Sequence, residues 1–238
     1  METVTFCTLN DLKESHISLG NALNIMYSNR AAKIGNVDCL KYLQENRCDW
    51  GLKTCTYAAF HGQLECLKYL YENGCPWDKS SLYCCVLNGH LDCVKFFLET
   101  EEEGYGKDIN WGWGTNLCYY AAYNGHLNVL KYLRVKGYQW DEKALISSSL
   151  YGRLDILKYA NDTGFNIPLK QCLLVSKIRK KVHNIDCVKY IESLIDRNKA
   201  AIKIQSAARG IMTRKRTGFH NPHTEIGRKY ILAMFHNI

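Results

Sequence analysis

A phrase of 20 residues recurs along the first 190 residues of this 238-residue chain. AAKIGNVDCLKYLQENRCDW at 31–50 returns as AAFHGQLECLKYLYENGCPW at 58–77 and as AAYNGHLNVLKYLRVKGYQW at 121–140, and shorter copies cover 85–99 and 149–165. Such a period predicts a solenoid, because a single unit of this size cannot bury its own apolar face. One glycine anchors each copy, and successive anchors are 27, 27, 36 and 27 residues apart: Gly35, Gly62, Gly89, Gly125 and Gly152.

Two short helices are expected within each unit. Small residues such as Ala58 and Ala59 end the first helix, and the anchoring glycine makes the turn. The second helix then follows, with Leu64, Leu67 and Leu70 on one apolar face. A tryptophan stands eight residues before the small pair in four copies, which favours a packing position over four binding sites: Trp50, Trp77, Trp113 and Trp140.

The twelve cysteines of the chain are expected to pack rather than to react. One repeat position holds cysteine in four copies, but Val129 and Ile156 in two others: Cys39, Cys66, Cys93 and Cys187. A position that accepts valine or isoleucine is apolar, and free cysteine behaves there as a small hydrophobe. No pair has C-x-x-C spacing, so the strongest zinc and redox signatures are missing. We therefore expect reduced thiols, no metal and no cofactor.

Bulk composition excludes several classes of protein. With 47% apolar and 23% charged residues, the chain is unlike a disordered one. It has no apolar run of the roughly 20 residues that a membrane span needs. It also does not begin with a basic region followed by an apolar run, as a secretory signal does. These features predict a cytoplasmic protein.

The net charge of +8 lies entirely at the C-terminal end. Residues 1–196 contain 22 basic and 22 acidic side chains, which cancel. Residues 197–238 contain nine basic side chains and one acidic one, Glu225, so nine minus one accounts for the whole excess. This asymmetry predicts a separate functional segment.

The repeated phrase, best seen at 58–77, resembles ankyrin repeats of the short, cysteine-rich type found in large DNA viruses of amoebae and algae. The resemblance implies an all-α, ankyrin-like solenoid of helix–turn–helix repeats, followed here by a long basic C-terminal helix. The repeat is about six residues shorter than the roughly 33 of the standard unit. The usual T-P-L-H opening is absent, and Thr54 and Thr115 keep only a threonine-like start. We therefore expect tight loops in place of extended fingers between units.

These patterns divide the chain into four parts. We expect an N-terminal capping segment at 1–30, a repeat array at 31–195, a basic helix at 196–218 and a C-terminal amphipathic helix at 219–238. Within the array the expected units lie near these ranges: 31–57, 58–84, 85–120 with an insertion at 99–112, 121–147 and 148–191.

Two features of the array are candidate contact surfaces. A lysine recurs at one position of the second helix, and an acidic residue stands three residues earlier in most copies, so this row is either a track for an acidic partner or a solvated face of paired charges. The insertion combines acidic residues with Tyr105 and Trp111, and is either a binding loop or a plain surface loop. The lysines are Lys41, Lys68, Lys95, Lys131 and Lys158.

The segment IQSAARGIMTR at 204–214 is similar to the IQ motif, I-Q-x-x-x-R-G-x-x-x-R, at every fixed position. The resemblance implies binding by calmodulin or a related EF-hand protein. Ile204, with Ala208 and Ile211 on the same face, would fill the partner's apolar groove, and Gln205 would hydrogen-bond its backbone. Gly210 would permit close approach, and Arg209 and Arg214 would pair with the acidic rim. The alternative is a basic helix that only caps the array.

The favoured function is therefore a non-catalytic adaptor, whose repeats hold one protein while the tail recruits an EF-hand protein. The alternative is a virion or assembly component with a basic docking tail. If the chain is viral, the expected place is the host cytoplasm, or the virion itself. Nucleic-acid binding through the tail is the weaker reading, because no recognition fold is evident. No nucleophile-elbow, P-loop or dinucleotide-binding pattern occurs, so no enzymatic activity is expected.

Overall fold

The computed structural model describes residues 8–18, 25–100, 114–178 and 185–216. These residues form α-helices only, without a strand. The chain divides into two compact units, Met1–Lys189 and Tyr190–Ile238. The expected insertion (99–112) lies outside the described residues from 101 onward, and the expected C-terminal helix (219–238) lies wholly outside them.

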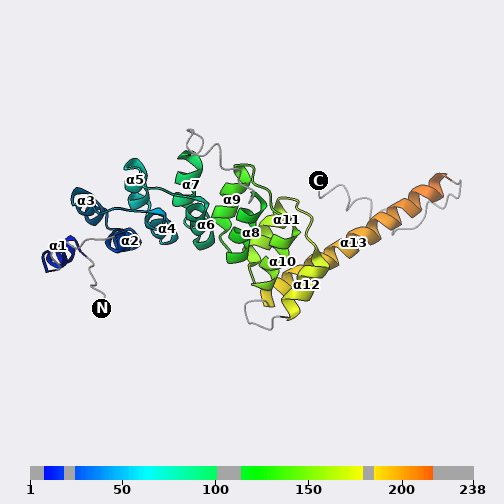
Figure 1. The fold of residues 1–238 in the computed structure, drawn as a ribbon. Helices are drawn as coiled ribbons and strands as arrows, with labels where there is room; N and C mark the ends of the chain where they lie inside the picture. Colours follow the sequence, from blue (N-terminus) through cyan, green and yellow to red (C-terminus); the bar gives the residue numbers. More distant parts are fainter. Residues whose placement is uncertain (1–7, 19–24, 101–113, 179–184, 217–238) are drawn as a thin grey trace. The chain divides into compact units, whose positions relative to one another are not determined.

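The first unit is built from helix pairs, as the repeat predicts (Figure 1). The first helix of each pair, which we call a first helix, packs on the first helix of the next pair in chain order. The first helices are α2 (Ile25–Ile34), α4 (Leu52–Phe60), α6 (Lys79–Asn88), α8 (Gly114–Asn124), α10 (Glu142–Leu150) and α12 (Leu169–Ile178). The second helices pack against their own partners: α3 (Val37–Glu45), α5 (Leu64–Glu72), α7 (Leu91–Thr100), α9 (Leu127–Val135) and α11 (Leu154–Asp162). The array is thus a stack of hairpins.

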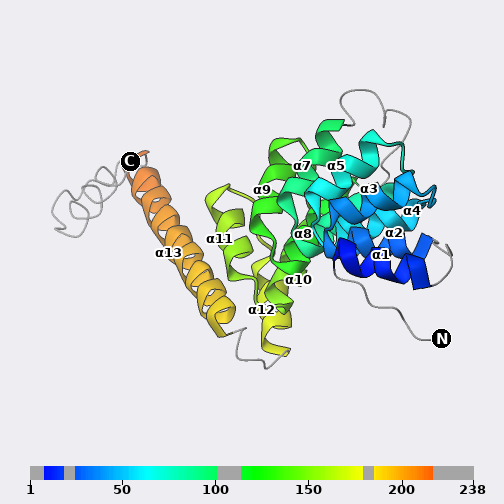
Figure 2. The same ribbon diagram turned by 90° about the vertical axis from the view of Figure 1, so that its left-hand side faces the viewer.

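The second helices form the other layer of this unit. Helices α3, α5, α7 and α9 contact one another in sequence (Figure 2). Helix α1 (Leu9–Ser18) packs against α3. Thr8 and Asp11 cap the start of α1 through reciprocal hydrogen bonds of 2.9 and 3.2 Å between side chain and backbone. Helix α1 therefore occupies the position of a second helix before the first complete pair.

Each turn between paired helices depends on its anchoring glycine. Gly62 and Gly89 have φ of +70° and +79°, a left-handed conformation that other residues adopt only with strain. The Gly89 amide closes α6 by bonding to the carbonyls of Cys85 and Val86. The loops that lead to the next pair are six residues long at 46–51, 73–78, 136–141 and 163–168, which agrees with the expected loss of extended fingers.

The core lies where neighbouring pairs meet. Leu67 and Leu70 of α5 are almost completely buried, and so are Ala58 and Ala59 of α4. The cysteines of the recurring position are buried as well, and all eleven described cysteines are free thiols. Burial raises the pKa of Cys66 to about 12, so this thiol is protonated at neutral pH. The packing role predicted for these cysteines agrees with the structure.

The tryptophans that the structure describes contact the second helices. Trp77 lies 5.0 Å from Phe97 of α7, and Trp140 lies 5.9 Å from Tyr159 of α11, measured between ring centroids. Of the three tryptophans in the described ranges, Trp140 alone is buried, at 6% exposure. These contacts support the packing interpretation. Trp113 lies outside the described residues.

The long helix predicted at the end of the array is present as α13 (Ile185–Arg216). Near its start, Cys187 is buried, and burial followed by the charge of Asp186 raises its pKa to about 11. Ile191 and Leu194 are also buried. From Asp196 to Ala207 every residue is exposed, so the helix changes from a buried to a solvent-facing segment at this point.

Candidate partner-binding sites

The exposed part of α13 carries the residues predicted to bind an EF-hand protein. Ile204 is 42% exposed and Ala208 is half-buried, four residues further along the helix. Gln205 and Arg209 are exposed. Gly210, Ile211 and Arg214 belong to α13, but their side chains lie outside the described part of the structure. The placement on one helix therefore agrees with the motif, while the role of each residue remains a prediction.

This segment presents basic charge together with apolar surface. From Arg197 to Arg209 the helix contains four basic residues and no acidic one. Ile202, which is not one of the fixed positions of I-Q-x-x-x-R-G-x-x-x-R, is 64% exposed. Because two residues are separated by about 200° around a helix, Ile202 and Ile204 lie on different faces. The helix thus exposes one isoleucine at a fixed position of the motif and another, two residues earlier, on a different face.

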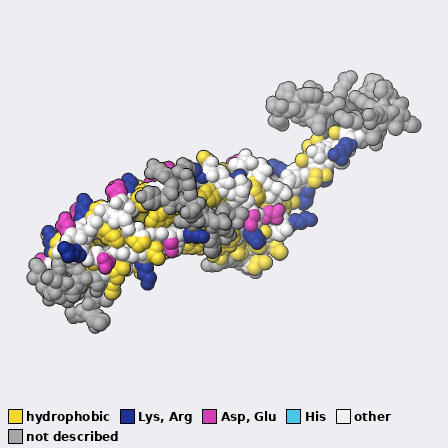
Figure 3. Space-filling view, turned by 45° about the horizontal axis from the view of Figure 1, so that its top comes forward, with side chains coloured by type: hydrophobic (Ala, Val, Ile, Leu, Met, Phe, Trp, Pro, Cys, Tyr) yellow, Lys and Arg dark blue, Asp and Glu magenta, His cyan; other side chains and the backbone are white. Residues whose placement is uncertain are grey.

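The lysine row on the second helices forms local ion pairs. Lys41 lies 3.7 Å from Asp38, Lys68 lies 2.8 Å from Glu65, and Lys95 lies 3.3 Å from Asp92. Lys131 stands over the ring of Tyr159 at 5.5 Å, and Lys158 forms no ion pair with any residue that the structure describes. Acidic and basic side chains lie next to one another over the array in Figure 3. This geometry favours the solvated-face reading of the row. The other proposed contact residues, Tyr105 and Trp111, lie outside the described residues.

A second surface, for which the repeat pattern gave no prediction, runs along the first helices. We call it the first-helix face: Lys53, Thr56, Tyr57 and Phe60 of α4, with the residues at the same repeat positions in the other first helices. In each first helix these four positions follow helical spacing, so their side chains lie on one side of the helix. None of these residues is buried where the structure describes the side chain, whereas the opposite side of each helix faces the core.

Tyrosines gather at the centre of the first-helix face. The rings of Tyr83 and Tyr120 meet edge to face at 4.7 Å between centroids, and Tyr119 lies 5.1 Å from Tyr120. Tyr123 donates a hydrogen bond of 2.7 Å to the hydroxyl of Tyr151. Burial, followed by hydrogen bonding to Tyr120, raises the pKa of Tyr83 to about 12. All five side chains are half-buried.

The signal for this cluster was present in the sequence. Tyr119, Tyr120 and Tyr123 stand around the small pair Ala121 and Ala122, and residues on either side of a buried pair must face outward on a helix. The contribution of Tyr83 could not be found in this way, because it comes from the preceding repeat, on the other side of the insertion.

A ladder of hydrogen bonds joins the turns of neighbouring repeats. After four of the five turn glycines, the next side chain donates to a carbonyl of the preceding repeat. His90 Nε2 reaches Phe60 O at 3.0 Å, and His126 Nε2 reaches Leu87 O at 3.0 Å. Gln63 bonds Lys33 O and Arg153 bonds Tyr123 O, both at 3.3 Å. This ladder stabilises the stack and explains the polar residue in each turn.

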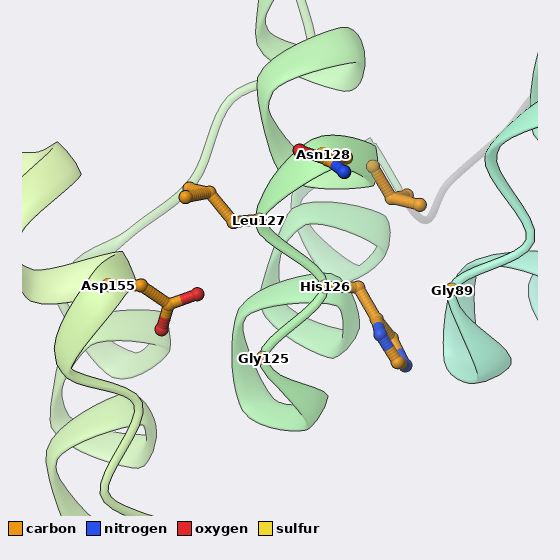
Figure 4. A pocket seen from close by; sticks show the side chains of 7 residues that line it. Gly89, Gly125, His126, Leu127, Asn128 and Asp155 are labelled. Atoms are coloured by element: carbon orange, nitrogen blue, oxygen red, sulfur yellow. The ribbon is translucent and has the colours of Figure 1, made fainter.

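A pocket of about 340 Å³ lies beside this ladder, between Gly89, the turn at Gly125 and Asp155 of α11. The imidazole of His126 extends toward Gly89, while Asp155 lies on the other side of the turn (Figure 4). The pocket residues are those of the repeat junction, and they include no pairing of nucleophile and base. In the described part of the chain, no group of three or more His, Cys, Asp or Glu side chains could hold a metal ion.

The comparisons with known proteins agree with this architecture. Ankyrin repeats (three copies) match residues 28–111 and 82–171, which together are more than half of the chain. The chain therefore belongs to the ankyrin repeat family. The IQ calmodulin-binding motif matches residues 198–217. No curated protein matches the chain.

Among solved structures, the human ASB11 ankyrin repeat domain is similar to this chain, with a TM-score of 0.53 and 19% sequence identity. The match covers 69% of this chain and 82% of that one. Identity this low shows a shared fold alone. Ankyrin repeats are typically a non-enzymatic interaction scaffold, and the comparisons return no catalytic domain. None of the described helices combines the length and hydrophobicity that crossing a membrane requires.

Proposed function

We propose that this protein is a non-catalytic adaptor, in which the repeat array holds one protein and α13 recruits calmodulin or a related EF-hand protein. The observation that carries the proposal is the exposure of an IQ-type helix beyond Leu194, the last buried residue among the side chains that the structure describes. A helix whose apolar strip was covered by the protein itself would offer nothing to a partner's groove. Ile204 at 42% exposure is available for such a contact.

The charge of the helix supports the same partner. EF-hand proteins present an apolar groove with an acidic rim, which suits a basic amphipathic helix. Arg209 and Arg214 are proposed to pair with that rim, because the arginine fork binds carboxylates with two parallel hydrogen bonds. Gln205 and Gly210 are proposed to contact the partner's backbone, and Ala208 and Ile211 to extend the strip of Ile204.

The resemblance to short, cysteine-rich repeats of large DNA viruses supports a viral source and action in a host cytoplasm, and we keep both as parts of the proposal. Its physical basis is the set of buried, free cysteines, which suit a reducing compartment. In this reading the adaptor would bring a calmodulin-type protein of the host to the target of the repeats.

Titration of the full chain with calmodulin, with and without calcium, tests the proposal. Ile204→Asp should weaken binding by a factor of about 30 or more, because burying a carboxylate in an apolar groove costs at least about 2 kcal/mol. Ile202→Asp is the matched control, since it makes the same change on another face of the same helix. Calorimetry should show near-normal affinity for this control.

The opposite result would favour the docking-tail alternative. If both variants bind like the unmodified chain, and the affinity disappears as salt rises, the attraction is plain charge on a basic tail. That behaviour is expected of an assembly component that docks on acidic surfaces, not of an adaptor with a groove-bound helix.

A further inference from the structure

The charges of the two helix layers differ. In the first-helix face every charged side chain is basic, and the one acidic residue in the described first helices, Glu142, stands beside that face rather than on it. Lys53, Lys143 and Lys170 are exposed and form no ion pair with any described residue. The basic residues of the face are Arg30, Lys33, Lys53, Lys143, Lys170 and Lys177.

The second helices show the contrast. Three of the five lysines in the row pair with carboxylates one helical turn away, as Lys68 does with Glu65 at 2.8 Å. Because a local pair cancels most of its field at a distance, that layer does not select the charge of a partner. The first-helix face has no acid at its own positions, so its charges are all of one sign, and the nearest acids are the helix caps Asp78 and Asp141.

The first-helix face also carries the apolar and aromatic area that an interface needs. Tyr57 and Phe60 are 41% and 42% exposed, and the tyrosine cluster around Tyr120 follows on the next repeats. Tyrosine and other aromatic residues dominate interface energetics, because they bury a large area at low entropic cost and carry a polar tip. The Tyr119 hydroxyl accepts a hydrogen bond from Ser147 at 3.3 Å, which leaves its proton for an acceptor such as a carboxylate.

We propose that the first-helix face binds an acidic segment of another protein, in which apolar side chains pack on the tyrosines and carboxylates meet the flanking lysines. This inference rests on the proposed function, since it names the chemistry of the partner that the repeats hold. It assigns that role to the first-helix face, in place of the lysine row on the second helices.

A protein segment fits this surface better than a nucleic acid. The rings of Tyr83 and Tyr120 are at 84° to each other and pack together, so they do not offer parallel faces on which successive bases could stack. The six cations are spread over four helices, α2, α4, α10 and α12, instead of forming a dense stripe that would track a phosphate backbone. Separate cations between apolar patches match separate carboxylates between apolar side chains.

The test is selection of a displayed library of random 16-residue peptides on the full chain, followed by anisotropy measurements with one enriched, labelled peptide. We expect the enriched peptides to carry an excess of Asp and Glu together with aliphatic or aromatic residues. The triple change Lys53→Glu, Lys143→Glu and Lys170→Glu should lower the affinity for that peptide by about tenfold or more, because it reverses the charge that faces the ligand. Tyr57→Ser, at an exposed position, should weaken it as well.

Two control proteins locate the binding. Lys41→Glu, Lys95→Glu and Lys158→Glu change the net charge equally, but on the second helices, and should leave the affinity within about twofold. Lys203→Gln with Arg209→Gln tests whether the basic tail captures the peptide instead. Thermal unfolding of each variant shows whether it has folded.

The proposal is overturned if no peptide is enriched, if the enriched peptides show no acidic excess, or if the loss follows either control. It is also overturned if a 20-nucleotide oligouridylate binds the first-helix face more tightly than the peptide. Calmodulin binding measured on the same variants separates this inference from the proposed function. The first-helix changes should leave it unaltered, and Ile204→Asp should leave peptide binding unaltered.

Discussion

Apolar residues at helical spacing occur both in the repeat array and in α13, but their surroundings differ. Leu130 and Leu133 of α9 are fully buried, because the helices of adjoining repeats cover them. Ile204 is 42% exposed in a segment where every residue from Asp196 to Ala207 faces solvent. Spacing therefore defines the apolar face of a helix, but a second surface must be present before that face becomes core. Positions covered by another repeat should respond strongly to mutation, and uncovered ones weakly.

The largest difference is expected between two aliphatic truncations. Leu130→Ala should reduce the free energy of unfolding by about 3 kcal/mol, since it removes buried methyl groups and leaves a cavity. Ile204→Ala should change it by less than about 0.5 kcal/mol, as for other exposed sites. Urea unfolding followed by circular dichroism measures both. Equal losses would mean that the strip on α13 is covered after all.

Two glycines sharpen the comparison within the array. Gly62 and Gly74 have similar φ, +70° and +74°. A Cβ at Gly62 would lie 2.5 Å from the His90 ring of the next repeat, whereas a Cβ at Gly74 would have no neighbour within 4 Å. Gly74→Ala should cost about 1 kcal/mol of backbone strain. Gly62→Ala should cost about 2 kcal/mol or more, because the ladder must also shift.

Thermal unfolding of the two glycine variants measures the difference. A Gly62→Ala protein as stable as Gly74→Ala would show that His90 can move away freely, and that the ladder contributes little to stacking.

A buried thiol gives the comparison a pH dependence. The folded pKa of Cys66 is about 12, above its usual value near 9 in an unfolded chain. The unfolded state therefore loses its proton first, and this thiol's contribution to stability is complete below pH 9 and is lost as pH rises toward 12. When the pH is raised from 8 to 10, the free energy of unfolding should fall by about 1 kcal/mol less for Cys66→Val than for the unmodified chain.

Denaturant unfolding at the two pH values measures this effect. Valine is the suitable replacement, because Val129 occupies the same position in another repeat. Identical pH profiles for the two proteins would contradict burial of the Cys66 thiol.

The smallest effect is expected at Arg47, which stands where Gly74 and Gly137 stand in other repeats. Its φ of +56° places a non-glycine residue in the left-handed region. Arg47→Gly should stabilise the protein by about 0.5–1 kcal/mol, since relief of strain exceeds the greater freedom of glycine in the unfolded chain. Calorimetric unfolding measures the gain. A loss of stability would show that Arg47 makes contacts that outweigh the strain.

Much of the fold follows from the repeat itself. The paired helices, the turn glycines and the buried cysteine position were all predictable, because each repeat shows independently which residues the same structural position accepts. Cysteine alternating with Val129 and Ile156 shows a packing position more clearly than one cysteine could. The continuous helix of α13 was also predictable, since no proline or glycine interrupts residues 185–209.

The binding surfaces were harder to predict. The lysine row is conspicuous in the repeat, but three of its lysines are paired with carboxylates on their own helices. The tyrosine cluster is inconspicuous, because Tyr83 and Tyr119 share a repeat position but lie 36 residues apart across the insertion, while Tyr120 and Tyr123 occupy other positions. The boundaries of the units and the roles of the IQ residues remain predictions.

By itself, the sequence determined which side of each helix is apolar, where each helix turns and where the excess positive charge lies, because these are local properties of composition and spacing. Only the tertiary structure decided which apolar faces are covered, which lysines are paired and which tyrosines meet. Those properties depend on contacts between repeats, since burial and pairing require a second surface that no single unit contains.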